Sequence, residues 1–382
     1  MNRLLVLTEL FLPTRGGTAV WAAEVYRRLG GKEIHIVTAD VPGAAEMDAA
    51  HPNTVHRLAL RRIAWLRPES LAMYARFFAV SLKLALLHRF DAIHAFRALP
   101  EGLVAWGVAR LTGRPVVIYA HGEELTSWGD GAKYRVMRFV LRRANRVVAN
   151  STHTQATLLA MGVPAARIVL IYPGVDVSVF KPGLDTAGLR SQLGILPDDK
   201  LVFSVGRLSR RKGFDQTLLA VARLREQGLR VHYVLAGIGE EAATLDRLIQ
   251  THRLTGIVHR IGAVNGSDLP RWLNTCDVFA MPNREINGDN EGFGMVFIEA
   301  AACGKVSLAG EAGGTGSAVL HNETGLRVDG NSLEAVTEGL RILLTQTDRV
   351  AVWSQRALDR VQREFAWERV ADKTRLLGKP EI

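Results

Sequence analysis

The chain has 382 residues, of which 48% are hydrophobic and 23% are charged, and its two cysteines are Cys276 and Cys303. This composition excludes a disordered or fibrous protein, and the length predicts two domains of roughly 150–200 residues each. Because two cysteines in apolar stretches cannot staple so long a chain, we expect a reduced, cytoplasmic setting. The net charge of +10 falls entirely within residues 1–175, and residues 176–382 are neutral overall. A basic first half suits an anionic partner such as nucleic acid, a membrane surface or a phosphorylated ligand.

Apolar runs typical of buried strands alternate with helical patterns along the first half. The strand candidates are residues 3–8, 34–38, 54–59, 92–95, 115–120, 146–150 and 168–171, and the clearest helices are 19–29, 69–88 and 133–143. This alternation predicts a parallel sheet with helices on both faces. The pattern loosens over residues 172–180, which favours a domain boundary after Val175.

A second alternating series follows, and a helical tail ends it. Its strand candidates are residues 201–205, 230–236, 257–261, 278–281 and 305–309, with helices at 214–226, 241–252, 267–274, 295–302, 332–344 and 351–377. We therefore predict an α/β protein with two Rossmann-like, doubly wound domains, residues 1–175 and 176–355, facing across a cleft. The tail, residues 356–382, is expected to pack on the first domain. In such sheets ligands bind outside the carboxyl ends of the strands.

Two loops at predicted strand ends have the chemistry of a phosphate site. Arg207 and Lys212 flank the loop after the strand 201–205, and two cations at that spacing can clamp a diphosphate. Arg210 and Arg211 between them are interpreted as solvated. Gly17 follows Gly16 at the start of the first helix, where backbone amides favour an anion, although a plain turn explains the pair equally well.

The most specific motif is the pair Glu291 and Glu299 around a helix start. Gly292 and Gly294 keep Glu291 in a loop, while Glu299 lies within the apolar helix, where an unpaired carboxylate is costly. Two acceptors beside helix N-terminal donors suit a phosphorylated, polyhydroxylated ligand, although a structural salt bridge would also explain Glu299. His121 ends the strand 115–120, where it could donate to a substrate hydroxyl or phosphate, or could be structural.

These motifs together resemble glycosyltransferase family 4, whose members are retaining enzymes with the GT-B fold that use nucleotide-diphosphate sugars. The resemblance covers nearly the whole chain in the same order and includes a C-terminal helix that crosses back to the first domain. It rests on Gly16-Gly17, His121-Gly122-Glu123, Arg207…Lys212-Gly213 and Glu291…Glu299. The stretch EGFGMVFIEAAACG looks especially like the phosphatidylinositol mannoside mannosyltransferases and their bacterial relatives.

The resemblance implies a role for each matching position. Arg207, Lys212 and Gly17 would hold the donor diphosphate, and Glu299 the ribose. Glu291 and His121 would be the catalytic pair that contacts the transferred sugar. The sugar and phosphate loop would be Gly292, Phe293, Gly294, Met295 and Val296, and the nucleobase pocket would include Arg260, Ile261 and Val264. One departure from the family pattern is the loop Gly313-Gly314-Thr315-Gly316-Ser317, where many members have Pro-Glu after the glycine pair. This difference weakens any inference about the nucleobase of the donor.

The expected activity is transfer of a hexose to an acceptor hydroxyl, with GDP-mannose favoured as donor and UDP-glucose next. Neither a cofactor nor a metal is expected, since no Asp-x-Asp occurs in the chain. A nucleotide-sugar epimerase of the same fold remains an alternative. A basic nucleic-acid-binding protein is a second alternative. The aromatic residues of the basic run 133–146, Tyr134 and Phe139, are helix-spaced and are interpreted as core residues and not as a base-stacking arrangement, so nucleic acid is not expected as a partner.

The basic first domain also predicts where the enzyme works. Apolar side chains among cations suit docking on an anionic leaflet, so we expect a cytoplasmic enzyme bound peripherally to the inner face of the cell membrane, with a lipid-linked or otherwise anionic acceptor. A solvated basic surface over an ordinary core remains the alternative. The cations concerned are Arg57, Arg61, Arg62, Arg67, Arg76, Lys83, Lys133, Arg135, Arg138, Arg142, Arg143 and Arg146.

Overall fold

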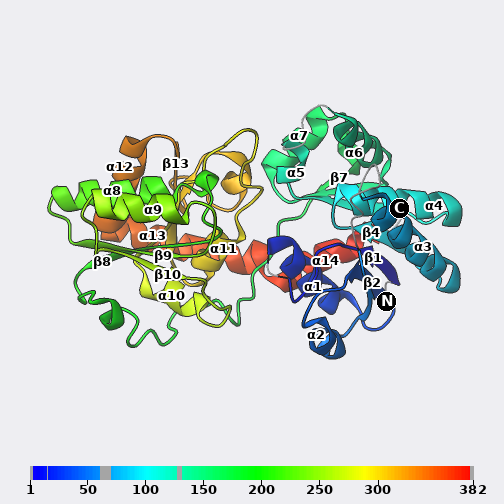
Figure 1. The fold of residues 1–382 in the computed structure, drawn as a ribbon, viewed down its shortest axis with the longest axis horizontal. Coiled ribbons are helices and arrows are strands. Elements are labelled where there is room, and N and C mark those ends of the chain that lie inside the picture. The colour runs from blue at the N-terminus through cyan, green and yellow to red at the C-terminus, as the bar shows by residue number, and fades with distance from the viewer. Residues whose placement is uncertain (1–2, 15, 61–69, 127–130, 379–382) are drawn as a thin grey trace. The chain divides into compact units, whose positions relative to one another are not determined.

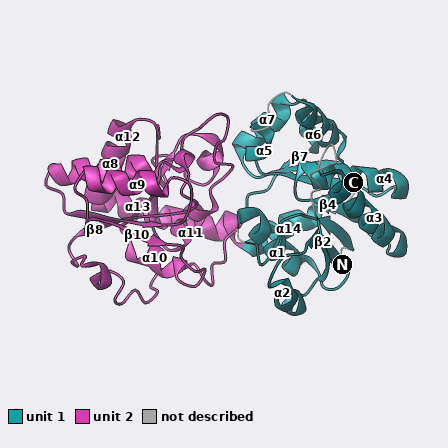
Figure 2. Cartoon of the chain, in the orientation of Figure 1, with its two compact units in different colours: residues 1–173, 367–382 teal, residues 174–366 magenta. Residues whose placement is uncertain are grey.

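A computed structural model describes residues 3–14, 16–60, 70–126 and 131–378 and divides the chain into two compact units. Unit 1 comprises residues 1–173 and 367–382, and unit 2 comprises residues 174–366 (Figure 2). Each unit is built on its own sheet, with helices packed against it (Figure 1). This arrangement confirms the predicted α/β class.

The sheet of unit 1 has seven strands in the order β3-β2-β1-β4-β5-β6-β7, and all pairs are parallel. The strands are β1 (Leu4–Leu7), β2 (Ile34–Ala39), β3 (Thr54–Leu58), β4 (Ala92–Ala95), β5 (Val116–Ala120), β6 (Arg146–Ala149) and β7 (Ile168–Leu170). Most residues of β1, β2, β4, β5 and β6 are buried, because both faces of the sheet are covered. The order reverses between β1 and β4, and such a switch point leaves a crevice at the carboxyl ends.

Amphipathic helices cover this sheet. In α6, for example, Met137, Val140 and Leu141 recur at helical spacing and are all buried. The helices before β7 are α1 (Gly17–Leu29), α2 (Ala44–Ala50), α3 (Leu71–Leu87), α4 (Leu103–Thr112), α5 (Glu123–Thr126), α6 (Ala132–Arg143) and α7 (Thr152–Ala160). The last helix of the chain, α14 (Trp367–Arg375), also belongs to unit 1, where it packs on α1 and pairs Glu368 with Arg28 Nε at 2.9 Å.

The sheet of unit 2 has six parallel strands in the order β10-β9-β8-β11-β12-β13. They are β8 (Lys200–Val205), β9 (Val231–Ala236), β10 (Val258–Gly262), β11 (Val278–Met281), β12 (Val306–Gly310) and β13 (Gly325–Val328). The edge strand β13 was not predicted, because its short sequence Gly-Leu-Arg-Val has only two buried residues and no apolar run. In this sheet of unit 2, the strand order reverses between β8 and β11, which is the switch point.

The helices of unit 2 are α8 (Phe214–Glu226), α9 (Ala242–Thr251), α10 (Leu269–Thr275), α11 (Met295–Ala302), α12 (Leu333–Thr345) and α13 (Thr347–Arg360). The predicted tail starts later than expected. Residues 356–366 belong to unit 2, because α13 buries Trp353, Ala357 and Arg360 against that unit, and the chain changes unit only at Trp367. The helical segment that the sequence predicted as one tail therefore packs on unit 2 up to residue 366 and on unit 1 from Trp367 onward.

Candidate functional site

Two loops meet at the switch point of the sheet in unit 2. The loop after β8 carries the short 3-10 helix Arg210–Lys212, and the loop after β11 carries Glu291. Lys212 Nζ contacts the Glu291 carboxylate, so the structure brings together two of the predicted site residues that are 79 positions apart. Both side chains are 13% exposed. The pair lies where doubly wound folds bind their ligands.

Gly213 allows this close approach. Its φ is +73°, and a Cβ at this position would lie 2.1 Å from the carbonyl oxygen of Pro282, directly after β11. Any other residue would therefore push the Lys212 turn away from the loop that holds Glu291. The turn is held further by Arg284, whose N–H donates to the carbonyl of Arg211 at 2.7 Å.

Glu291 is held by two cations. Besides Lys212, Arg211 Nη1 donates to Glu291 Oε2 at 2.9 Å, and Arg211 Nε reaches Asp289 Oδ2 at 3.1 Å. Burial acts to raise the pKa of Glu291, but the charges of Lys212 and Arg211 outweigh it and lower that pKa below its usual value. Glu291 is thus an ionised acceptor at neutral pH.

The interpretation of Arg211 as a solvated residue is wrong. Its side chain is 17% exposed and bridges two carboxylates, whereas its neighbour Arg210 is exposed as expected. The residue type of Arg211 gives no sign of this difference, because its acidic partners, Asp289 and Glu291, lie about eighty residues away. Adjacency to Lys212 in a turn that approaches β11 is the one signal that could have singled out Arg211.

Arg207 lies at the end of β8 but does not join the Lys212 cluster. Its Nε pairs with Glu240 Oε2 at 3.1 Å, and the two side chains are 75% and 52% exposed. An ion pair this exposed contributes about 0–1 kcal/mol, so little opposes its replacement by a ligand. Arg207 is an exposed surface cation at the same edge of the sheet as Lys212.

The segment from Gly292 to Val296 leads into α11. Gly294 caps the helix with φ +85°, and Phe293 is buried edge-on against Phe365 at 5.8 Å between ring centroids. No side chain caps α11 within the described chain, so its first amides remain available. Met295 and Val296 are half-buried at the helix start.

Glu299 lies within α11, and burial raises its pKa to about 7. Throughout the residues that the structure describes, it has no salt bridge, which disfavours the structural ion pair considered from the sequence. A half-buried carboxyl without a cation suits hydrogen bonds with neutral hydroxyl groups.

The predicted nucleobase residues end β10, at the same edge of the sheet. Arg260 turns its guanidinium to α9, where it pairs with Asp246 and donates to the carbonyl of Ala242 at 2.9 Å. This side chain therefore braces the strand. Ile261 and Val264 are half-buried beside it, and the Gly262 carbonyl accepts the N–H of Gly237 at 2.6 Å.

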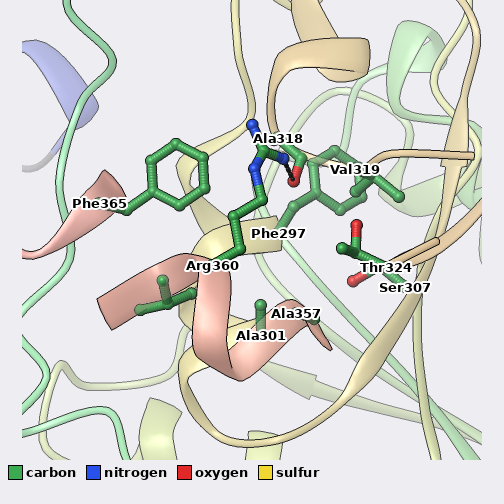
Figure 3. A pocket seen from close by; sticks show the side chains of 10 residues that line it. Phe297, Ala301, Ser307, Ala318, Val319, Thr324, Ala357, Arg360 and Phe365 are labelled. Atoms are coloured by element: carbon green, nitrogen blue, oxygen red, sulfur yellow. Dashed lines mark hydrogen bonds between the residues drawn. The ribbon is translucent and has the colours of Figure 1, made fainter. Parts of the chain in front are cut away.

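The loop that departs from the family pattern supports Glu291 from the other side. The N–H of Gly314 donates to the carbonyl of Glu291 at 2.7 Å. Arg360, from α13, donates to the carbonyl of Ala318 at 3.2 Å (Figure 3). It also donates to the carbonyl of Ser317 at 2.8 Å. The cavity lined by Arg360 and Phe365 measures about 10 Å³, which is room for one water and not for a nucleotide. Arg360 is thus a brace for the loop.

Unit 1 holds the other two predicted site residues. His121 follows β5, and its Nε2 donates to the carbonyl of Phe96 at 2.6 Å, which leaves Nδ1 as an acceptor. Burial, helped by the charge of Arg97, lowers the pKa of His121 to about 4. His121 is therefore neutral and suited to accept from a hydroxyl, not to donate to a phosphate as the sequence suggested. Gly17 is exposed at the first turn of α1, which has no side-chain cap among the described residues.

A buried carboxyl at the switch point of unit 1 escaped the sequence analysis. Glu101 is 1% exposed, and its Oε1 accepts the N–H of Glu9, in the loop after β1, at 2.8 Å. Burial raises the pKa of Glu101 to about 7. This carboxyl anchors the loop that leads to Gly17, and nothing in its local sequence marks it as buried.

The described part of the chain has neither a metal-binding cluster nor a membrane-spanning helix. No group of three or more His, Cys, Asp or Glu residues there could hold a metal ion. No helix there is both long and apolar enough to cross a membrane.

Comparison with known proteins identifies the family. "Glycosyltransferase Family 4" matches residues 15–179, and "Glycosyl transferases group 1" matches residues 185–360. The GDP-mannose-dependent alpha-(1-6)-phosphatidylinositol monomannoside mannosyltransferase of Mycobacterium tuberculosis is 31% identical over 98% of this chain and 97% of its own. This chain belongs to glycosyltransferase family 4. It is a glycosyltransferase, as its motifs predicted.

A second curated relative and a solved structure are also similar to this chain. The D-inositol 3-phosphate glycosyltransferase of Rhodococcus jostii is 32% identical over 74% of this chain and 65% of its own. Among solved structures, Anabaena HepE, in complex with UDP and glucose, superposes with a TM-score of 0.80 at 22% identity, covering 98% of both chains. The latter comparison shows the GT-B fold.

Proposed function

We propose that this glycosyltransferase transfers a hexose, with mannose favoured, from a nucleotide-diphosphate sugar to an acceptor hydroxyl with retention of configuration. The main support for this proposal is the contact between Lys212 and Glu291 at the switch point between β8 and β11. It puts a cation for the leaving group beside an ionised acceptor for the sugar. GDP-mannose is the favoured donor because the mycobacterial relative is named for it, and UDP-glucose is next.

The departing diphosphate is the group on which negative charge develops, so stabilising it lowers the barrier. Lys212 and Arg207 supply positive charge, and the amides at the start of α11 supply donors. Glu291 binds the transferred sugar and stabilises the positive charge that develops on its ring. The acceptor hydroxyl attacks from the face of the leaving group, whose phosphate oxygen takes the proton.

Glu299 and the end of β10 would bind the nucleoside. A carboxyl whose pKa is near 7 and which lacks a cation can form hydrogen bonds with the two ribose hydroxyls. The backbone of residues 261–264, and not the side chain of Arg260, would contact the base. In unit 1, neutral His121 would accept from a sugar hydroxyl, and Gly17 would offer amides to a phosphate.

We propose further that protein cations neutralise the diphosphate without a metal. Transfer should then persist in excess EDTA. Complete loss of activity that manganese or magnesium restores would contradict this proposal.

The decisive experiment is a panel of nucleotide sugars incubated with the protein, with and without lipid extract. Release of GDP or UDP that depends on an added acceptor, with a glycosylated product, supports the proposal. An epimerised nucleotide sugar or a free sugar formed without an acceptor would support the epimerase instead. Failure to consume any nucleotide sugar would overturn both.

We also propose that the acceptor is lipid-linked or otherwise anionic and that unit 1 docks on an anionic membrane. Two helices support this proposal. Helix α6 has cations along its length and no acidic residue. In α3, the apolar side chains of Leu86 and Leu87 are 70% and 67% exposed. Four of the predicted cations do not contribute to this argument. Arg57 is structural, since it holds Asp48 at 2.7 Å, and Arg61, Arg62 and Arg67 lie outside the described residues.

The docking face can be tested by co-sedimentation with vesicles of increasing phosphatidylglycerol content. Each basic residue near the surface contributes about 1 kcal/mol, so binding should rise with anionic lipid and fall with salt. Arg135→Glu on α6 should weaken binding, while the matched variant Arg223→Glu, on an exposed position of α8, should not. Equal recovery in the supernatant under all conditions would refute docking.

A further inference from the structure

Glu291 has one more cation than a simple ion pair needs. Its carboxylate is 13% exposed and contacts both Lys212 and Arg211. The proposed function requires Lys212 for the donor diphosphate. If Lys212 moved to the ligand and Arg211 were absent, the largely buried Glu291 carboxylate would remain without a counter-charge, which is strongly unfavourable.

Arg211 is built to stay when Lys212 leaves. Its Nε is fixed by Asp289 at 3.1 Å while its Nη1 holds Glu291 at 2.9 Å. Its main chain is fixed as well, since its carbonyl accepts the N–H of Arg284 at 2.7 Å. Arg284 is in turn 5% exposed and paired with Asp215 at 2.7 Å. The planar guanidinium can serve two carboxylates at once, which a lysine cannot do with the same geometry.

Lys212 has the opposite character. Its ammonium carries three rotatable donors on a flexible stem, and across the described chain its Nζ contacts a single acidic group, Glu291. It can therefore swing to a phosphate oxygen while its backbone stays in the Arg210–Lys212 turn.

We propose that Arg211 is a positioning residue that keeps Glu291 ionised and oriented, so that Lys212 is released to the donor diphosphate. This inference rests on the proposed function. Without Arg211, Lys212 becomes the sole counter-charge of Glu291, and a nucleotide diphosphate must break that pair to bind. Neutralising Glu291 removes this competition, so the two substitutions should compensate each other.

The test is titration calorimetry with GDP and with UDP on the full chain. Arg211→Gln should weaken binding roughly tenfold or more, the size expected when one charge-assisted contact is lost. Arg211→Lys should recover part of the affinity because it returns a positive charge to Glu291. The matched control Arg210→Gln, at the exposed neighbouring position, should bind as the wild type does.

The double variant Arg211→Gln/Glu291→Gln separates positioning from a general structural role. We expect its affinity to return to within about twofold of the wild type, because Lys212 is then free. Thermal unfolding checks that each variant is folded. Equal binding by Arg211→Gln and wild type, or a double variant as weak as Arg211→Gln, would overturn the inference alone. A wild-type chain that binds neither GDP nor UDP would overturn the proposed function and the inference with it.

Discussion

Gly213→Ala tests whether the contact between the β8 and β11 loops builds the donor site. Both Gly213 and Gly194 end short 3-10 helices with similar backbone angles, φ +73° and φ +69°. A Cβ in this left-handed region costs about 1–2 kcal/mol at either position. At Gly194 nothing lies within 4 Å of the added atom, so Gly194→Ala should lose only that amount.

At Gly213 the added Cβ would lie 2.1 Å from the Pro282 carbonyl oxygen, and ordinary contact begins at 3.4 Å. The two loops must separate, and forced displacement of packed atoms adds about 1–3 kcal/mol. Gly213→Ala should therefore lose about 2–5 kcal/mol of the free energy of unfolding, measured by urea denaturation.

The same displacement moves Lys212 away from the end of β11, so calorimetry should also show weaker GDP and UDP binding. Gly194→Ala should leave nucleotide affinity unchanged. Equal losses of stability in the two variants, with nucleotide binding intact in both, would refute the argument that this contact positions Lys212.

Further predictions concern single side chains. Lys212→Ala should weaken GDP or UDP binding roughly 10–150-fold in calorimetry, since a charge-assisted contact contributes about 1.5–3 kcal/mol. Arg207→Ala should also weaken binding but change the free energy of unfolding by less than about 1 kcal/mol, because its present ion pair is exposed. Glu299→Ala should weaken nucleotide binding, and unchanged affinity would assign Glu299 a structural role. Burial lowers the pKa of His94, which contacts the Tyr26 hydroxyl at 2.7 Å, to about 3. Because the unfolded chain binds this proton near pH 6.5 and the folded chain does not, His94 should cost roughly 3 kcal/mol of stability between pH 6.5 and 4, a slope that His94→Gln should reduce in urea denaturation.

The sequence predicted most of the fold because buried parallel strands have a strong local pattern. The twelve predicted strands correspond to β1 through β12, most of which are largely buried in their sheets. β13 escaped because its four residues, Gly-Leu-Arg-Val, contain no apolar run. The break between α13 and α14 escaped for a similar reason, since the same helical periodicity continues while the buried face changes from one unit to the other.

The site shows the same division between local and long-range information. The sequence alone determined which residue types stand at the strand ends, because a strand followed by a loop and a helix start is a local pattern. Their partners depend on how distant segments pack together in the folded chain. Arg210 and Arg211 have equivalent local sequence, yet Arg211 alone reaches Asp289 and Glu291. That difference arises because β8 and β11 are neighbours in the sheet, so their loops meet. The charge of a side chain does not indicate which distant residues will lie next to it.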